Sequence, residues 1–204
     1  MQIDLSTLQP SQVYFTMTQT LLPRPIAWVL SENEAGGYNL APFSYFTAVC
    51  SDPPLLLISA GRRPEGGPKD TTVNITARRR FVVHIAHREQ LEPLNASSAS
   101  WPSEVSEVDK LGLATTTFEG FSLPRLADCR VAYACELHQL IELGRGPQAL
   151  ILGEVKAVYL DDAIVSQDEK GRLKVHADRL DPVSRLGPEE YATFGEIVHL
   201  IRPQ

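Results

Sequence analysis

A glycine-rich loop that leads into a helix is the first stretch of this chain whose residues could do chemistry. Residues 61–71 read GRRPEGGPKDT, and Asp70 or Thr71 can cap the helix that follows. A helix N-terminus presents free N–H groups and the positive end of the helix dipole, so it binds anions. Arg62 and Lys69 add positive charge, and Thr71 can donate its hydroxyl. The loop is therefore a candidate phosphate site.

The spacing of this loop leaves an ordinary interpretation open. It matches neither the GxxxxGK[ST] pattern of a P-loop nor the GxGxxG pattern of a dinucleotide-binding fold. Local features alone favour a solvated loop that feeds a normally capped helix. Other parts of the chain must decide between these two interpretations.

A polar and aromatic run precedes the loop. Residues 39–46 read NLAPFSYF and carry an amide, two hydroxyl groups and aromatic rings. In extended chain such side chains offer hydrogen bonds and a stacking wall to a planar heterocycle. The alternative is a strand with a proline bulge whose aromatic rings fill the core, and local features alone favour it.

Composition places the chain among globular proteins of one domain. It has 204 residues, of which 43% are apolar and 22% are charged, and these are ordinary values for a folded domain. The net charge of −6 argues against a nucleic-acid-binding surface, which is normally strongly basic. The basic cluster at residues 78–80 is short and isolated. We therefore expect no nucleic-acid partner.

The cysteines and the N-terminal residues bear on location. Cys50, Cys129 and Cys135 form no CxxC pair and join no histidine cluster with zinc-ligand spacing, which predicts no metal site. Their odd number fits a reducing cytosol. The first residues lack the basic and apolar regions of a signal peptide, and no apolar run approaches the ~20 residues that span a bilayer. We expect a cytoplasmic protein without a membrane partner.

The elements that must position the loop and the aromatic run are mostly strands. Apolar runs and turn residues predict extended chain at 26–30, 38–49, 55–60, 81–86, 129–143 and 148–160, a hairpin turn at 144–147 and a further hairpin over 164–177. Helices are expected over 70–79, 88–94 and 103–111 and a helical turn over 4–9, whereas 13–22 alternates weakly. The pattern predicts a mainly β domain, an antiparallel barrel with α-helices over its ends.

The order of these motifs resembles that of the flavin reductase-like family of FMN-binding split barrels. PRPIAWV, a glycine turn, NLAPFSYF, a DPP turn, an apolar strand, KDT and FVV follow one another, and LGEV at 152–155 is similar to the family's closing strand. The resemblance covers residues 23 to about 159. It implies a six-stranded antiparallel Greek-key split barrel, a non-covalently bound FMN and a homodimer. Residues 1–204 would form one domain with a core over about 20–165, and 166–204 would contribute to the dimer.

The resemblance also assigns candidate binding residues. Those expected beside the flavin ring and its ribityl chain are Ser31, Asn39, Ala41, Pro42, Phe43 and Ser44. Those expected to hold the ribityl phosphate are Ser59, Gly61, Arg62, Lys69, Asp70 and Thr71. Those expected to approach the flavin of a partner subunit are Ser97, Trp101, Arg185 and Tyr191.

In a protein of this family the flavin carries the chemistry, so no catalytic side chain is expected. The residues agree, because Ser, His and Asp show no nucleophile–base motif. The resemblance implies hydride transfer from NADH or NADPH to flavin N5, followed by electron transfer to oxygen, free flavin or a redox protein such as a monooxygenase. The sequence thus predicts a flavin reductase-like oxidoreductase.

Two positions depart from the family pattern, and the first of them keeps other functions open. Flavin reductases of this type often have a histidine near the nicotinamide, where this chain has Gln148. An FMN-binding electron carrier or flavin-storage protein, reduced by a protein partner, is the second hypothesis, and a split barrel that binds no flavin is the third. His84 stands where the family often has asparagine, and we expect a satisfied core residue. Arg24 is expected either to be structural or to face the flavin.

Overall fold

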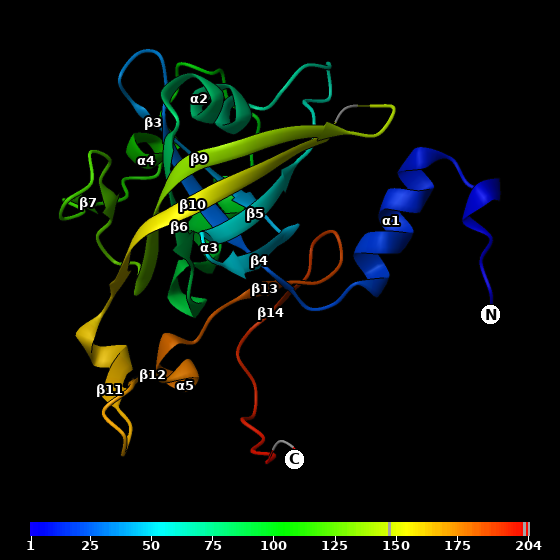
Figure 1. Ribbon diagram of the computed structural model, residues 1–204. Coiled ribbons are helices and arrows are strands. Elements are labelled where there is room, and N and C mark those ends of the chain that lie inside the picture. The colour runs from blue at the N-terminus through cyan, green and yellow to red at the C-terminus, as the bar shows by residue number, and fades with distance from the viewer. Residues whose placement is uncertain (147, 202, 204) are drawn as a thin grey trace.

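A seven-stranded antiparallel sheet forms the body of the protein, in the order β3-β2-β6-β9-β10-β5-β4 (Figure 1). The computed structural model describes residues 1–146, 148–201 and 203. The strands are β2 (Ala27–Glu32), β3 (Tyr38–Phe43), β4 (Phe46–Ser51), β5 (Pro54–Ala60), β6 (Arg80–Ile85), β9 (Val131–Leu143) and β10 (Gln148–Leu160). The sheet bends back on itself, because β3 at one edge approaches β5 near the other. The antiparallel barrel that the sequence predicts is confirmed.

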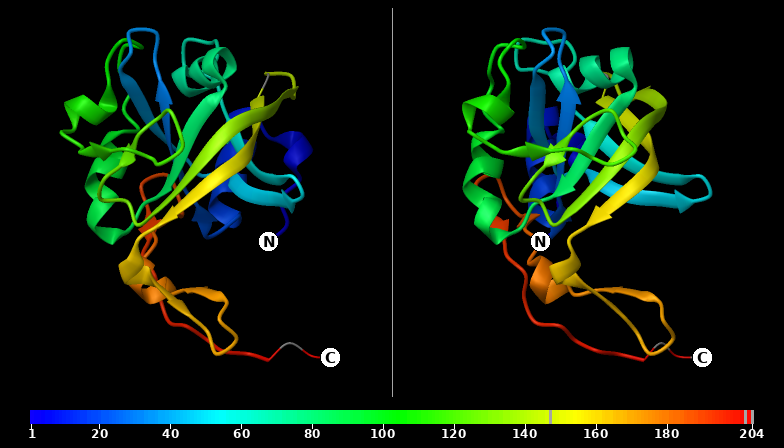
Figure 2. Two further views of the ribbon diagram at one scale, coloured as in Figure 1. Left: turned by 60° about the vertical axis from the view of Figure 1, so that its left-hand side comes forward. Right: turned by 90° about the vertical axis from the view of Figure 1, so that its left-hand side faces the viewer.

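Helices and short strands surround this sheet (Figure 2). The helices are η1 (Leu5–Thr7), α1 (Pro10–Thr20), α2 (Asp70–Arg78), η2 (Arg88–Gln90), α3 (Leu91–Ala96), α4 (Glu107–Lys110), η3 (Asp162–Ile164) and α5 (Ala177–Leu180). The short strands are β1 (Arg24–Pro25), β7 (Thr115–Thr116), β8 (Arg125–Leu126), β11 (Val165–Gln167), β12 (Leu173–Val175), β13 (Ser184–Arg185) and β14 (Tyr191–Ala192). None of the described helices has the length and apolar character needed to cross a membrane. Residue 147 of the expected turn, and residues 202 and 204 of the expected extension, lie outside the described residues.

The sheet has one strand more than the six expected. The extended run at 38–49 divides into β3, which pairs with β2, and β4, which pairs with β5. The change of partner takes place around Ser44 and Tyr45, where the backbone N–H of Ser59 donates to the carbonyl of Tyr45 (2.8 Å). The run therefore carries the chain from one edge of the sheet to the other without a turn motif that the sequence could show.

Helix α1 occupies most of the stretch that alternates weakly in the sequence. It begins with Pro10, which suits the first helical position, and Gln9 and Gln12 form a capping box around its start. Only Thr18 is buried. The helix has no apolar face packed on its own chain, which is why no helical period marks it in the sequence.

Helix α4 is shorter than the helix expected over 103–111. Its cap is Ser106, whose hydroxyl accepts from the backbone N–H of Asp109 (3.2 Å). Glu107 and Val108, the first two residues of the helix, are buried. The helix thus begins where the chain enters the core, and it brings a carboxylate into the interior.

Strand β2 is buried on both faces, because two apolar layers meet on it. Trp28 and Leu30 join one layer, to which α3 and α4 contribute. Ala27 and Val29 join the other layer, which holds Phe81 and fills the barrel. Successive side chains of a strand point to opposite faces, so a continuous apolar run serves both layers.

His84 on β6 is the satisfied core residue that the sequence predicts. It is fully buried, and its Nε2 accepts from the backbone N–H of Leu126 (2.9 Å). Nδ1 therefore carries the proton and donates to the carbonyl of Trp28 (3.1 Å). Burial lowers the pKa of His84 to about 4. The imidazole is neutral and structural.

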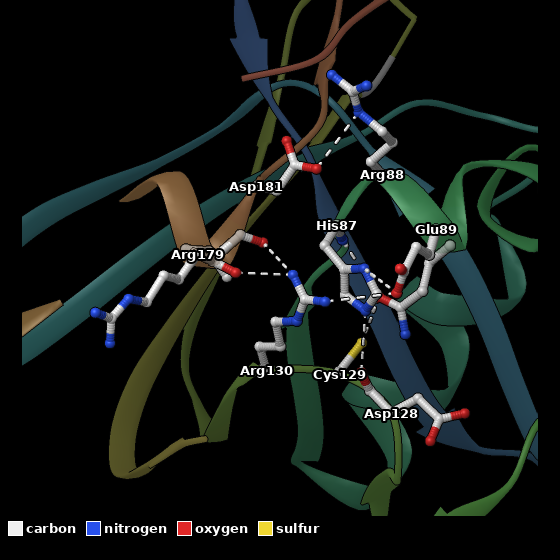
Figure 3. Close-up of polar contacts among 10 residues, drawn as sticks. His87, Arg88, Glu89, Asp128, Cys129, Arg130, Arg179 and Asp181 are labelled. Carbon is white, nitrogen blue, oxygen red and sulfur yellow. Dashed lines mark hydrogen bonds and ion pairs between the residues drawn. The ribbon is translucent and has the colours of Figure 1, made fainter. Parts of the chain in front are cut away.

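The C-terminal extension is held against the sheet by polar contacts around Arg130 (Figure 3). Arg130 donates through Nη1 to the carbonyls of Arg179 (2.8 Å) and Leu180 (3.3 Å). Arg88 Nε lies 3.4 Å from a carboxylate oxygen of Asp181. These contacts fix α5 beside the start of β9, and the chain that follows supplies β13, which pairs with β1.

Candidate functional site

Two adjoining cavities form a groove between α1, the loop before α2 and the C-terminal extension. The larger cavity holds about 610 Å³ and the smaller about 380 Å³. Pro42, Arg62, Lys69 and Ser98 line both, so the cavities lie side by side. Pockets that take small ligands have volumes of ~300–1,000 Å³. The groove is large enough for an extended cofactor.

The groove collects almost all of the site residues that the sequence predicts. Those that line the larger cavity are Pro42, Phe43, Ser44, Ser59, Gly61, Arg62, Lys69, Gln148, Arg185 and Tyr191. Those that line the smaller cavity are Asn39, Ala41, Pro42, Arg62, Lys69, Asp70, Thr71, Ser97 and Trp101. Ser31 lines neither cavity and is fully buried. Arg185 and Tyr191, which were expected beside a partner's cofactor, line the cavity of their own chain.

The N-terminus of α2 borders the smaller cavity through Lys69, Asp70 and Thr71. Lys69 occupies the N-cap position, and no side chain caps the helix. The first hydrogen bond of the helix runs from the N–H of Val73 to the carbonyl of Lys69 (3.1 Å). The N–H groups before it have no acceptor within the helix. An anion placed here would accept from them and meet the positive end of the helix dipole.

The loop before α2 is closed by its own backbone. The N–H of Arg63 donates to the carbonyl of Gly67 (3.1 Å), and the N–H of Gly66 donates to the carbonyl of Arg63 (2.9 Å). Gly66 and Gly67 have φ values of +95° and +83°, which glycine adopts without steric cost. The tight loop places both Arg62 and Lys69 where the two cavities meet.

The charges at this junction are not all neutralised. Asp70 forms an ion pair with Arg63. The Lys69 ammonium lies 5.4 Å from the centre of the Phe43 ring, and desolvation lowers the pKa of Lys69. Within the described part of the chain, neither Lys69 nor Arg62 has a carboxylate oxygen within 4.0 Å. The charges of Lys69 and Arg62 are therefore available to a bound anion.

A buried carboxylate anchors the other wall of the smaller cavity. Glu107 accepts from the backbone N–H of Leu40 (2.9 Å) and from the amide of Asn39 (3.1 and 3.2 Å). Asn39 in turn accepts from the hydroxyl of Thr71 (2.8 Å). Burial raises the pKa of Glu107, and the hydrogen bonds from Leu40 and Asn39 oppose that shift. The side chains of Asn39 and Thr71 are thus engaged with each other.

Ser31 belongs to this polar network and not to the surface of the groove. Its hydroxyl lies 3.4 Å from Asn39 Oδ1 and accepts from the amide of Asn74 (3.3 Å). The network therefore joins β2, β3, α2 and α4. Sequence reasoning missed Glu107, because its partners are distant in the chain and no local motif marks a glutamate that will be buried.

Gln148 lies in the wall of the larger cavity, at the start of β10. Its amide donates to the hydroxyl of Ser59 (3.0 Å). A Cβ added to Gly61 would lie 3.7 Å from Gln148 Oε1, so the amide also borders the chain that leads to the loop. The position offers a neutral hydrogen-bonding group.

Several residues that complete the larger cavity have no sequence signal of their own. They include Tyr14, Phe15 and Ser98. Arg24, for which two roles were open, has the structural one, because its buried guanidinium donates to three backbone carbonyls, and it also lines the cavity. These carbonyls belong to α1, to the residue after it and to the C-terminal extension. Only folding brings them together.

Ser97 and Trp101 lie in the wall of the smaller cavity. The Lys110 ammonium lies 4.1 Å from the centre of the Trp101 ring. The Ser97 hydroxyl accepts from the indole N–H of Trp28 (2.9 Å) and donates to the carbonyl of Leu94 (2.8 Å). Both hydrogen bonds join Ser97 to residues of its own chain, so Ser97 stabilises this wall of the cavity.

The larger cavity has the chemistry of an anion-binding site. The described lining of the larger cavity includes four cationic side chains, Arg24, Arg62, Lys69 and Arg185, and no carboxylate. The whole chain nevertheless carries a net charge of −6. A cleft lined by one sign of charge concentrates ligands of the opposite sign. Among the described residues, no group of three or more His, Cys, Asp or Glu could hold a metal ion.

Comparison with known proteins agrees with the fold. Residues 18–177 match the model of the flavin reductase like domain. Nitrilotriacetate monooxygenase component B from Bacillus cereus is 32% identical with a TM-score of 0.89, over 98% of this chain and 98% of that chain. 2-Nitrobenzoate 2-nitroreductase NbaA from Pseudomonas fluorescens is 30% identical with a TM-score of 0.88, over 100% of this chain and 96% of that chain. A protein from Shewanella frigidimarina, described as a flavin reductase with a split barrel domain, is 20% identical and shares the fold, with a TM-score of 0.83 over 100% of both chains.

Removal of the buried carboxylate should destabilise the protein. We predict that Glu107→Ala lowers the free energy of unfolding by about 1–3 kcal/mol, because the Asn39 amide and the Leu40 N–H lose their buried acceptor. Glu104→Ala is the matched control, because Glu104 lies three residues earlier and is exposed. It should change the free energy of unfolding by less than about 0.5 kcal/mol. Urea denaturation measures both. Equal stability of the two variants would contradict the role given to Glu107.

Proposed function

Because this chain belongs to the flavin reductase-like domain family, we propose that it is an FMN-dependent oxidoreductase of the flavin reductase type. The observation that carries the proposal is the uncapped N-terminus of α2, with Lys69 and Arg62 beside it, where the two adjoining cavities meet. FMN combines a planar ring with a phosphate that carries up to two negative charges. A groove with cations at its centre suits this ligand. When bound, FMN would supply the redox chemistry by accepting a hydride from NADH or NADPH and passing electrons on.

The residues of the chain divide between contact and support. The N–H groups of the first turn of α2, with Lys69 and Arg62, would hold the phosphate. The backbone at the junction of β3 and β4, from Ala41 to Ser44, would border the ring. Asn39 and Thr71 hold each other, so their part is to fix β3 against α2. No side chain is asked to transfer a proton.

The electron acceptor is proposed to be a separate protein or a small molecule. The likeness to nitrilotriacetate monooxygenase component B, at 32% identity over nearly the whole length of both chains, supports a monooxygenase as the redox partner. The three free cysteines, two of them buried, accord with a reducing compartment such as the cytoplasm.

Lys69 gives a direct test of the phosphate site. We predict that Lys69→Ala weakens FMN binding by about tenfold or more, because a charge-assisted hydrogen bond contributes ~1.5–3 kcal/mol. Riboflavin lacks the phosphate, so its affinity should stay unchanged. Lys170→Ala, on the exposed turn between β11 and β12, is the matched control. Quenching of flavin fluorescence measures each affinity.

An FMN affinity that Lys69→Ala leaves intact would place the phosphate elsewhere. A protein that stays colourless after incubation with FMN would reject the flavin and favour a split barrel that serves only as an interaction module.

A second candidate function is an FMN-binding electron carrier or flavin-storage protein. The observation that favours it is Gln148, a neutral amide bound to Ser59 in the wall of the larger cavity.

For the oxidoreductase, we predict that anaerobic NADH or NADPH bleaches the visible absorption of the bound FMN faster than that of free FMN. Stopped-flow absorption measures both rates. Equal rates would reject direct reduction and leave the carrier.

A homodimer is proposed because α1 and the edge of the sheet lack cover. Helix α1 stands at the edge of the molecule (Figure 1) and buries only Thr18. Large apolar side chains of α1 and of the two residues after it are exposed: Tyr14, Phe15, Met17, Leu21 and Leu22. Strand β4 beyond its first residue is exposed as well. Isolated helices of this length are marginal in water, so a second copy of the chain is expected to cover α1.

Sedimentation equilibrium tests the homodimer. We predict twice the mass of one chain for the wild-type protein, and a shift toward one chain for Leu21→Asp, because Leu21 is 56% exposed in a single chain and would be buried in the dimer. Leu173→Asp on β12, where Leu173 is 64% exposed, is the matched control and should remain dimeric. A wild-type protein that sediments as one chain would reject the dimer.

A further inference from the structure

Two arginines oppose each other at the end of the larger cavity that lies away from α2. Strands β1 and β13 are antiparallel, and Arg24 is the direct partner of Arg185. Side chains of directly opposed residues lie on one face of a ladder, ~4.5–5.5 Å apart at Cβ, and like charges there are destabilising. Both arginines line the larger cavity. The fold thus holds two positive charges together at one place.

The contacts of Arg24 fix its guanidinium without neutralising it. Arg24 is only 4% exposed. It donates to the carbonyls of Thr18 and Leu21, to the carbonyl of Leu186 (2.6 Å) and to the hydroxyl of Ser44 (3.3 Å). All of these acceptors are neutral. A buried charge is costly unless it is paired, so a counter-charge is expected nearby.

Arg185 has no counter-charge either. Its guanidinium lies 4.4 Å from the centre of the Tyr191 ring and donates to the carbonyls of Gly187 (3.2 Å) and Pro188. In the described residues, no carboxylate oxygen lies within 4.0 Å of Arg185 or of Arg24. These contacts aim a cation and a flat aromatic ring at the same cavity.

Two tyrosine rings border this end of the cavity, and the Tyr45 phenol does not supply a negative charge. Tyr14 and Tyr45 line the cavity with ring centres 6.3 Å apart. Desolvation raises the pKa of Tyr45, and Tyr14 adds to the shift, while Arg24 only opposes it. The Tyr45 phenol therefore stays neutral, and both rings give this end of the cavity aromatic walls.

The arginine pair is separate from the site at α2. Lys69 and Arg62 line both cavities, whereas Arg24, Arg185 and Tyr191 line only the larger one. A phosphate held at α2 by the first pair of cations would leave the second pair without an anion.

We infer that the arginine pair is a subsite for an oxyanion carried by a planar aromatic ligand, which enters the larger cavity beside Tyr191. Toward the described residues, Arg185 uses two of its five N–H donors and Arg24 uses four, so three donors of Arg185 and one of Arg24 are left for an oxyanion. Aromatic walls stack on a planar ring. Two sources share this chemistry, the carboxylate of an aromatic acid and the phosphate of an aromatic phosphoester. The use of the subsite by a redox substrate rests on the proposed function, whereas the binding of the anion does not.

Isothermal titration calorimetry with three small probes tests the subsite. Benzoate and phenyl phosphate carry the two oxyanions, and benzamide is the neutral match of benzoate. Each is titrated into the purified protein before and after saturation with FMN. We expect at least one anion to bind about tenfold or more tightly than benzamide, because hydrogen bonds to charged groups exceed those to neutral ones by this margin. The tighter of the two anions identifies the source.

Substitution of Arg185 completes the test. Arg185→Gln should abolish the preference for the anion and leave benzamide binding unchanged, and Arg185→Lys should retain part of it. Arg172→Gln, on the turn between β11 and β12, is the matched control and should keep the full preference. Equal binding of both anions and benzamide by the wild-type protein, which needs no variant, would overturn the inference. So would a preference that survives Arg185→Gln in folded protein, as checked by circular dichroism.

The same samples separate this inference from the proposed function. Visible absorption reports whether FMN is bound. A protein without affinity for FMN that still prefers the anion through Arg185 would reject the flavin function and keep the subsite. A protein that binds FMN but binds the anions and benzamide with equal affinity would reject the subsite and keep the flavin function.

Discussion

The buried hydrogen bonds of Glu107 are the constraint on which the groove depends. A carboxylate in the interior needs donors, and the chain supplies them from the backbone of Leu40 and the amide of Asn39. Asn39 then receives the hydroxyl of Thr71, one residue after the start of α2. The orientation of the helix N-terminus is therefore fixed by a residue of α4 that lies behind it. Any ligand held by the first turn of α2 depends on a contact that it does not itself touch.

The second feature of the site is the separation of charge within an acidic protein. Cations gather in the larger cavity, while the carboxylates of the described residues lie outside its lining. Arg24 shows how the fold keeps a cation there, since it is clamped by carbonyls from α1 and from the C-terminal extension. Helix α1 and the C-terminal extension thus meet at the cavity. The contacts of Arg130 with α5 hold the C-terminal extension in place.

Much of the fold could be predicted from the sequence, because local patterns decide it. Apolar runs between turn residues marked the strands, and the glycine-rich loop with Asp70 and Thr71 marked α2. The strand count was wrong because the chain crosses from β3 to β4 without a turn signal, and α1 was missed because it buries only Thr18. Glu107 could not be found, and the role of Arg24 could not be decided, since one partner of each lies 67 or 162 residues away in the chain. Only the folded structure shows that the predicted residues gather around one groove. Their roles toward FMN are a proposal.

The position of the FMN phosphorus atom in a crystal structure of the complex tests the central claim most directly. The account predicts that the phosphate oxygens accept from the N–H groups of the first turn of α2 and lie within hydrogen-bond distance of Lys69 or Arg62, with the flavin ring in the larger cavity. A phosphate bound away from α2, or a flavin outside the groove, would contradict it.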